Sequence, residues 1–407
     1  MRPLFASIVL LASVVTASAQ EGFFFQPKDR IVFLGDSITE QYQYSSTMEL
    51  YLTTRFPTWN LTFINAGIGG DTAGGGAGRF QSHVLDEKPT AVTINFGMND
   101  GGYGAFNPGS AANFVKNTEK MLDMAKKAGV RVAVLSPNAV DRRVQERFKL
   151  YLETQKQFYA GLKDAAAKYD ARYVDQYAMT RKTLEKMEAD GSKVIPFGDG
   201  FHTSSNGGLF MAHAILTGMN APATVSEVAI DAPGKSVTAK SAKVEKLTVT
   251  ETGVSFERTD EALPMPIQKD WTTLLPYVND LKDLNHYGLK VAGLPAKEYQ
   301  LLLDGKEVGK YSAKDLAEGV NLGNLQTGPL YDRGQKVWSA INDKNKIVHG
   351  RFRSVVMANI PEWLQDVAKE RKPAELQKRM EEIQQRQAAI YQMLTPTAVR
   401  FELKAVQ

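Results

Sequence analysis

The chain has 407 residues, of which 43% are hydrophobic and 23% are charged, and its formal net charge is +4 at pH 7. This composition is typical of a globular protein and excludes a fibrous or largely disordered chain. The length is sufficient for a catalytic core and a second, smaller region. Positive and negative charges are mixed along the chain, so we expect no nucleic-acid partner. The absence of cysteine excludes disulfides, thiolate metal sites and a cysteine nucleophile.

The first 19 residues have the pattern of a secretory signal peptide. Arg2 supplies a positive charge, residues 4–15 are largely apolar, and Ala17-Ser18-Ala19 has the small side chains that precede a cleavage site. We therefore predict cleavage between Ala19 and Gln20 and a secreted or periplasmic location. The apolar run is too short to span a bilayer, and no later stretch reaches the necessary length, so we expect no integral membrane segment in the mature chain.

Short apolar runs alternate with amphipathic segments between residues 28 and about 220. The runs predict strands at 31–34, 61–65, 91–96, 130–135 and 172–174, and the segments predict helices near 39–55, 110–128, 145–169 and 204–217. This alternation favours parallel strands joined by crossover helices, in an open three-layer α/β sheet. Active sites in such sheets form at the carboxyl ends of the strands.

Ser37 follows the first predicted strand, at the point where the pattern changes from strand to helix. A serine hydroxyl is a poor nucleophile until a base takes its proton and nearby dipoles stabilise the charge that develops. The start of a helix offers unpaired N–H groups and the positive end of its dipole. Taken alone, Gly35-Asp36-Ser37 could equally be only a helix cap.

Two further polar stretches follow the second and third predicted strands. The glycines of Asn65-Ala-Gly-Ile-Gly-Gly-Asp-Thr72 allow backbone N–H groups to approach a ligand closely. The glycine-rich run 74–78 could be a flexible turn, and it lacks the Gly-Lys-Ser/Thr of a nucleotide-binding P-loop. Asn99 would present its amide to the same crevice, although an asparagine that only shapes a turn is the alternative.

Asp199 and His202 supply a carboxylate and an imidazole after the last strand of the predicted sheet. At a spacing of three residues in a turn, the carboxylate can orient the imidazole while the other ring nitrogen faces a serine. His286 follows Asp283 at the same spacing, but it lies beyond the α/β alternation. We therefore predict that His202 is the base for Ser37.

These four stretches, in this order, resemble the SGNH/GDSL hydrolase superfamily over residues 28–220. The resemblance implies a flavodoxin-like three-layer α/β/α fold and a serine ester hydrolase that needs no metal or organic cofactor. Matched by motif, Ser37 would be the nucleophile, His202 the base and Asp199 its partner. The oxyanion hole would combine the N–H groups of Ser37 and Gly70 with the Asn99 amide. No proline follows His202, unlike in many relatives, so the subfamily stays open.

After residue 218 the pattern changes to short β-type runs, with a hairpin turn at Asp304-Gly305, and becomes helical from about residue 334. We predict a catalytic domain over 20–222, and a region over 223–407 that combines a small sheet, a helical hairpin and a final strand at 399–403. The apolar face of the last helix could bind a partner helix, but packing onto its own chain is favoured. That face carries Leu376, Met380, Ile383, Ile390 and Leu394. The hairpin over 291–308 and the Leu-Ala-Glu-Gly-Val-Asn run that follows it resemble the C-terminal extensions of secreted bacterial members of the superfamily, and the role of this half stays open.

The sequence thus favours a secreted esterase, with carbohydrate O-acetyl esters as the preferred substrate class. We expect Asp36, Tyr103 and Phe201 to line the substrate. The rings of Tyr103 and Phe201 can stack on sugars, although packing within the core is the alternative for each ring. A lipid acylhydrolase or lysophospholipase would use the same machinery. The alternative that is not an enzyme is a carbohydrate-binding protein that keeps the fold but has lost turnover. The sequence leaves the acyl group and the oligomeric state undetermined.

Overall fold

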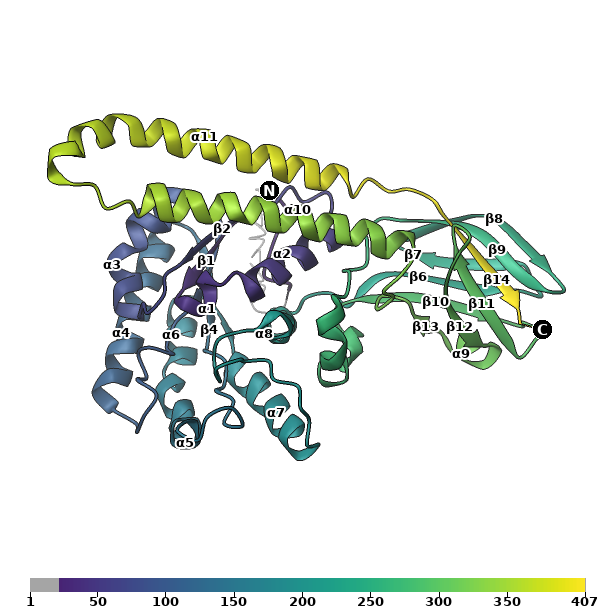
Figure 1. Cartoon of the computed structure of the whole chain (residues 1–407), viewed down its shortest axis with the longest axis horizontal. Coiled ribbons are helices and arrows are strands. Elements are labelled where there is room, and N and C mark those ends of the chain that lie inside the picture. Colours follow the sequence, from purple (N-terminus) through teal and green to yellow (C-terminus); the bar gives the residue numbers. More distant parts are fainter. Residues whose placement is uncertain (1–21, 407) are drawn as a thin grey trace, which may run out of the picture.

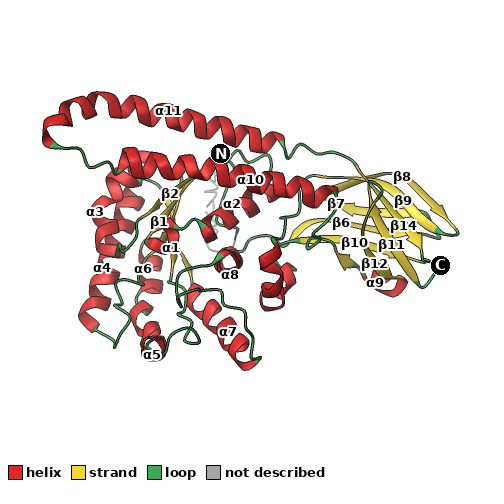
Figure 2. Ribbon diagram, viewed as in Figure 1, coloured by secondary structure: helices red, strands yellow, loops and turns green. Residues whose placement is uncertain are grey.

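The computed structural model describes residues 22–406 and combines an α/β part, a β-rich part and a long helical hairpin (Figure 1). The strands of the β-rich part gather at one end of the molecule, next to the helices of the α/β part (Figure 2). The predicted signal peptide, residues 1–19, lies outside the described residues. No helix between residues 22 and 406 has the combined length and apolar character that crossing a bilayer requires.

Five parallel strands form the sheet of the α/β part. They are β1 (Arg30–Gly35), β2 (Thr62–Gly67), β3 (Ala91–Asn95), β4 (Arg131–Leu135) and β5 (Arg172–Val174). Their order, β2-β1-β3-β4-β5, is that of flavodoxin-like sheets, as the resemblance implied. β1 and β3 are buried almost throughout because helices cover both faces of the sheet.

Eight helices accompany this sheet. They are α1 (Ser37–Glu40), α2 (Gln43–Arg55), α3 (Ala73–His83), α4 (Pro108–Lys127), α5 (Phe148–Tyr159), α6 (Leu162–Lys168), α7 (Gln176–Ala189) and α8 (Ser205–Gly218). The segment predicted as one helix over 145–169 is thus divided into α5 and α6.

Sequence patterns missed α3 and α7. The glycine-rich run 74–78, for which a flexible turn is one interpretation, lies within α3, although glycine disfavours helix. In the structure, the Thr72 hydroxyl caps this helix by accepting from the Gly75 N–H, and Phe80 is buried against the sheet. At the start of α7, the Asp175 carboxylate accepts from the Ala178 N–H. Capping and tertiary packing therefore override local propensity in α3, whereas α7 has a helix-favouring sequence that the apolar pattern did not reveal.

The β-rich part contains two sheets rather than the single small sheet that the sequence indicated. One has the order β13-β10-β6-β7 and the other the order β12-β11-β14-β9-β8. The final strand pairs with β11 on one side and β9 on the other, as the sequence suggested. The bounds are β6 Thr224–Asp231, β7 Ser236–Lys240, β8 Ala242–Thr250, β9 Gly253–Asp260, β10 His286–Ala292, β11 Glu298–Leu303, β12 Lys306–Ser312, α9 Ala313–Glu318, β13 Val320–Asn321 and β14 Val399–Ala405.

The helical hairpin packs onto the α/β part of its own chain. It consists of α10 (Pro329–Arg351), a π-helical turn (Phe352–Val356) and α11 (Gln365–Gln392). Figure 1 shows α10 lying between α11 and α2. The contact with α2 includes a buried ion pair between Lys344 and Glu49. The apolar face of α11 thus covers its own chain, as the sequence favoured.

Candidate active site

Ser37 is the first residue of α1, immediately after β1. The Asp36 side chain caps this helix by accepting a hydrogen bond from the Ile38 N–H at 3.0 Å. Because the first N–H groups of a helix have no acceptor within it, the Ser37 N–H is not used by α1. At Gly35, a Cβ would lie 2.1 Å from the Thr39 hydroxyl oxygen. The tight turn that presents Ser37 therefore requires glycine at this position.

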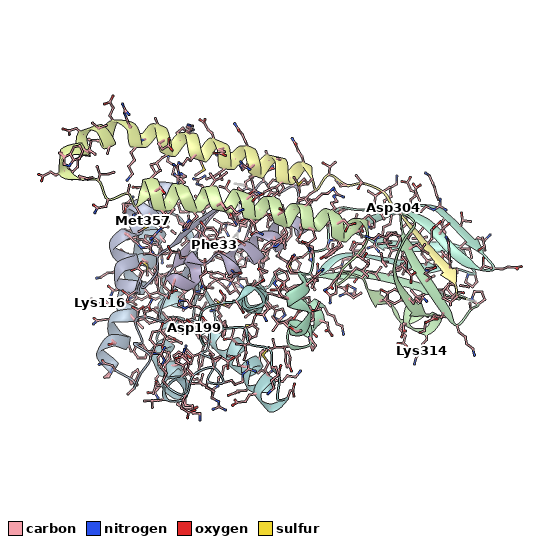
Figure 3. All side chains as sticks on the ribbon, in the orientation of Figure 1. Phe33, Lys116, Asp199, Asp304, Lys314 and Met357 are labelled. Atoms are coloured by element: carbon pink, nitrogen blue, oxygen red, sulfur yellow. The ribbon has the colours of Figure 1, made fainter. Side chains whose placement is uncertain are left out.

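Ser37, His202 and Asp199 form a continuous hydrogen-bonded chain. Ser37 Oγ lies 2.7 Å from His202 Nε2, although the two residues are 165 positions apart in sequence. His202 Nδ1 lies 2.7 Å from Asp199 Oδ2. Asp199 is labelled in Figure 3 within the α/β part, in the loop between α7 and α8. The fold thus brings the three residues together in the order that the sequence predicted.

The loop that carries Asp199 and His202 is held closed by its own hydrogen bonds. Asp199 Oδ1 accepts from the backbone N–H groups of Phe201 at 3.2 Å and His202 at 2.9 Å. The Gly198 N–H donates to the His202 carbonyl, and the Gln145 side chain donates to the Asp199 carbonyl at 2.7 Å. These contacts fix the carboxylate relative to the imidazole. Gln145 is a contributor that the sequence patterns did not identify.

Hydrogen bonding keeps Asp199 ionised. Partial burial raises the pKa of its carboxyl, but the His202 ring and the two backbone N–H groups outweigh burial and hold the pKa below its usual value. An ionised carboxylate favours the imidazole tautomer with its proton on Nδ1. Nε2 is then free to accept a proton from the Ser37 hydroxyl.

Gly70 lies in a tight turn next to Ser37. The Asp71 N–H donates to the Ile68 carbonyl at 3.2 Å, and Gly70 has a φ of 75°, a conformation that favours glycine. A Cβ on Gly69 would lie 4.0 Å from Ser37 Cβ, which places the turn beside the serine. Within residues 22–406, the Gly70 N–H has no hydrogen-bond acceptor. It is therefore available to a ligand.

Asn99 is anchored to the same turn. One N–H of its amide donates to the Asp71 carbonyl at 2.8 Å, and its oxygen accepts from the Tyr103 hydroxyl at 3.4 Å. Because a side-chain amide has two N–H donors, the second remains for a ligand. Ser37, Gly70 and Asn99 can thus each offer one N–H donor to a ligand.

Asp36, Asp71 and Asp100 place three carboxylates close enough to interact electrostatically, and Asp36 is the most deeply buried. Its side chain caps α1 and is only 2% exposed, so Asp36 supports the serine instead of lining the substrate, contrary to expectation. Burial raises the pKa of Asp36 to about 7 and that of Asp100 to about 6. Asp100 accepts from the Ala73 N–H at the start of α3, and Asp71 pairs with Arg79 at 2.8 Å.

Arg79 is a supporting residue that the sequence patterns missed. Its guanidinium donates to the carbonyls of Ala66 at 2.8 Å and Gly35 at 3.2 Å, in addition to its pair with Asp71. It thereby ties the end of β1 to the end of β2. Arg79 lies about two turns after the start of α3, where it faces Asp71. The sequence could have indicated this contact only if the glycine-rich segment had been predicted to be a helix.

Aromatic rings lie beside His202. The Phe201 ring centroid is 4.2 Å from that of His202, and the Tyr103 centroid is 4.9 Å from that of Phe201. Both residues are half-buried, so part of each side chain is accessible. Tyr44, another aromatic near the motif in sequence, is fully buried and donates or accepts at the Thr39 hydroxyl.

The second histidine with an upstream aspartate does not form a comparable pair. Asp283 contacts His213 at 3.0 Å instead of His286, and His286 lies 3.4 Å from Glu227 on β6. Both histidines belong to elements other than the loop that contacts Ser37. The structure therefore leaves His202 as the imidazole at the serine.

Comparisons with known proteins show that the part of the chain containing this site is similar to one protein family. Residues 33–207 match the model of the GDSL-like Lipase/Acylhydrolase family. The chain is 33% identical over 92 residues to Esterase TesA of Pseudomonas aeruginosa, which is 22% of this chain and 44% of that protein. It is 30% identical over 116 residues to the Arylesterase of Vibrio mimicus, which is 27% of this chain and 55% of that protein. The chain thus spans about half the length of these curated relatives.

A solved structure resembles nearly the whole chain. It is described as BT4096, a gut microbial diltiazem-metabolizing enzyme, and it has a TM-score of 0.82 and 25% sequence identity. The similarity covers 95% of this chain and 100% of that chain. The combination of α/β part, β-rich part and helical hairpin is therefore shared with another protein.

Proposed function

We propose, from the match of residues 33–207 to the model of the GDSL-like Lipase/Acylhydrolase family, that the chain hydrolyses carboxylic esters through an acyl-serine intermediate. The observation that carries the proposal is the hydrogen-bonded chain from Ser37 through His202 to Asp199, with both distances at 2.7 Å. This geometry matches a nucleophile, a general base and the group that orients the base.

In the first half of the proposed reaction, Ser37 Oγ attacks the ester carbonyl carbon while its proton passes to His202 Nε2. The tetrahedral intermediate collapses, its C–O bond to the alcohol breaks, and the alcohol leaves with the proton from His202. In the second half, water attacks the acyl-serine and gives its proton to His202, which returns it to Ser37 Oγ as the acid leaves. Asp199 keeps the imidazole oriented throughout.

The negative oxygen of each tetrahedral intermediate would be held by the N–H groups of Ser37 and Gly70 and by the Asn99 amide. Loss of one such donor typically costs roughly 3 kcal/mol of transition-state stabilisation. The fixed turn around Gly70 and the anchoring of Asn99 by Asp71 support this role, because preorganised donors need not reorient during the reaction.

We propose carbohydrate O-acetyl esters as the substrate class. The half-buried rings of Phe201 and Tyr103, next to His202, support this choice because aromatic faces can pack against sugar rings. A lipid acylhydrolase is the second candidate, since the half-buried rings of Phe201 and Tyr103 are apolar and suit an acyl chain as well as a sugar.

The substrate proposal is tested with esters that differ only in chain length. A higher kcat/KM for 4-nitrophenyl acetate than for the decanoate, together with acetate release from an acetylated polysaccharide, would support it. A clear preference for the decanoate would favour the lipid alternative instead.

The nucleophile is tested by Ser37→Ala. We expect kcat for 4-nitrophenyl acetate to fall at least roughly 1,000-fold, because removal of a serine nucleophile leaves only residual catalysis. Ser82→Ala, at an exposed position in α3, is the matched control and should retain activity. Unchanged turnover by Ser37→Ala would mean that another group is the nucleophile, whereas a wild-type protein without turnover would favour a binding protein.

We also propose that the protein is exported, on the basis of the charged start, apolar run and Ala-Ser-Ala pattern of residues 1–19. Expression of the full chain in a bacterium with intact export, followed by mass measurement of the purified protein, tests this. A mass corresponding to a chain that begins at Gln20 is expected, and an intact N-terminus in the cytoplasmic fraction would contradict the proposal.

A further inference from the structure

The Glu40 carboxylate, at the end of α1, contacts both the turn of the helical hairpin and the glycine turn beside the proposed oxyanion hole. Glu40, the last residue of α1, accepts a hydrogen bond from the Gly69 N–H with Oε2 at 2.7 Å. Its other oxygen, Oε1, lies 3.3 Å from the Arg353 guanidinium. Glu40 therefore links the C-terminal hairpin to the residue that precedes Gly70.

Glu40 lies close enough to the site to influence it in two ways. A Cβ on Gly69 would lie 3.0 Å from Glu40 Oε2 and 4.0 Å from Ser37 Cβ, so a single glycine separates the carboxylate from the serine. By holding the Gly69 N–H, Glu40 restricts the backbone rotation that sets the direction of the Gly70 N–H. However, its negative charge opposes the negative charge that would develop on the substrate oxygen.

Arg353 is well placed to offset that charge because its backbone is anchored. It lies in the π-helical turn Phe352–Val356, which ends beside Met357 in Figure 3. The Phe352 ring packs edge-on against His83 with ring centroids 5.3 Å apart, and Lys372 donates to the Val356 carbonyl at 2.9 Å. π-helical turns are often found at functional sites.

We propose that Glu40 and Arg353 are positioning residues for the turn that carries Gly70, between Ile68 and Asp71. Glu40 holds the turn that carries Gly70, and Arg353 orients the Glu40 carboxylate and compensates its charge. The C-terminal region thereby contributes to turnover without contacting the substrate. This inference rests on the proposed ester hydrolysis, and it assigns a role to a part of the chain that the catalytic motifs do not include.

The first test compares Arg353→Ala with Arg353→Lys. Because the Arg353 side chain is 41% exposed, we expect Arg353→Ala to lower kcat by roughly 3- to 10-fold, less than the loss of an oxyanion donor, with KM changed less than about 2-fold. Arg353→Lys keeps the positive charge and should recover most of kcat. Arg386→Ala removes an ion pair on α11 whose arginine is 48% exposed, and it should retain wild-type kinetics.

The second test uses Glu40→Gln, whose amide oxygen can still accept from the Gly69 N–H but carries no charge. In this background, Arg353→Ala should have little further effect on kcat, because the charge that Arg353 compensates is absent. Raising the ionic strength should also narrow the kcat difference between wild type and Arg353→Ala, since salt screens exposed charges. Glu40→Ala removes the acceptor as well and should lower kcat more than Glu40→Gln.

Three results would overturn the inference. One is an Arg353→Ala enzyme with the kinetics of Arg386→Ala. Another is an equal loss from Arg353→Ala in the wild-type and Glu40→Gln backgrounds. The third is a kcat loss in Arg353→Lys as large as that in Arg353→Ala. Ser37→Ala measured in parallel separates this inference from the proposed function: if it retains turnover, both fail, and if it is inactive while Arg353→Ala is normal, only the inference fails.

Discussion

At the scale of single residues, Asp199 illustrates how a local pair becomes part of a long-range arrangement. Its two oxygens divide their roles: Oδ2 contacts the His202 ring, and Oδ1 accepts from two backbone N–H groups of the same loop. The loop therefore preorganises the carboxylate before any substrate binds. Only the contact of His202 with Ser37 depends on the rest of the fold.

Asp199→Asn tests this division of roles. The amide can keep contacts with the loop, but it no longer selects the imidazole tautomer, so we expect kcat to fall by roughly 100- to 10,000-fold. KM and the thermal unfolding temperature should change little, because the Asp199 side chain is partly exposed. Steady-state kinetics and thermal unfolding provide the two measurements. A variant with near-normal kcat would show that the carboxylate does not orient the base.

Asp36 makes a separate contribution to the folding stability, and this contribution depends on pH. Burial raises its pKa to about 7 in the folded state, whereas an unfolded aspartate titrates near about 4. The folded state thus binds this proton more tightly than the unfolded state does. The stability contribution of the protonated group is fully present below about pH 4 and is lost as the pH rises through about 7.

Asp36→Asn should remove this pH dependence. The Asn side chain can still accept from the Ile38 N–H and cap α1, but it does not ionise. We expect the stability of the variant relative to wild type to increase between pH 4.5 and pH 8, as measured by denaturant unfolding at both values. An equal difference at the two pH values would contradict the raised pKa of Asp36.

At the scale of elements, α3 shows how packing converts an unfavourable sequence into a helix. Its glycines are not equivalent. A Cβ on Gly76 would lie 2.4 Å from the Phe96 ring, so the close approach of α3 to the sheet requires glycine there. A Cβ on Gly78 would have no atom within 4 Å, so nothing in its surroundings requires glycine.

The two glycines give a matched pair of variants in one helix. Gly76→Ala should lower the free energy of unfolding by about 1–3 kcal/mol, because the methyl group overpacks against Phe96. Gly78→Ala should raise it by about 0.5–1 kcal/mol, because alanine favours helix at an exposed position. Denaturant unfolding of both variants tests the assignment, and equal effects would show that α3 does not pack on Phe96 as described.

At the scale of the whole molecule, a buried polar cluster joins the hairpin to the α/β part. Lys344 on α10 is fully buried and donates to Glu49 on α2 and to Gln387 on α11. Asn345 donates to the second Glu49 oxygen at 3.0 Å. Burial lowers the pKa of Lys344, and the Glu49 carboxylate counteracts this effect. The cluster thus fixes one register of three helices that are distant in sequence.

Removing only the lysine of this ion pair should lower the stability of the protein strongly. Lys344→Met leaves the Glu49 charge buried without its cation, so we expect the free energy of unfolding to fall by about 3–5 kcal/mol. Adding Glu49→Gln removes that charge and should recover part of the loss. Denaturant unfolding of both variants provides the measurement. A loss below about 1 kcal/mol in Lys344→Met would indicate that the hairpin is held by its apolar contacts alone.

The sequence by itself determined the features that arise from local periodicity and turn chemistry. Apolar runs located all five strands of the α/β sheet, and the break after Leu34 located Ser37 at the start of a helix. The spacing of Asp199 and His202 already indicated a paired carboxylate and imidazole. Motif resemblance added the fold and pointed to the family whose model matches residues 33–207.

The tertiary structure alone decided the features that depend on contacts between distant segments. It set the contact between Ser37 and His202, the burial of Asp36, and the division of the β-rich part into two sheets. It also formed α3 from a glycine-rich segment and brought Arg353 to Glu40. The physical reason is that periodicity records which face of an element is buried, whereas the partner that buries it, and the charge that meets it there, are set only when the chain has folded.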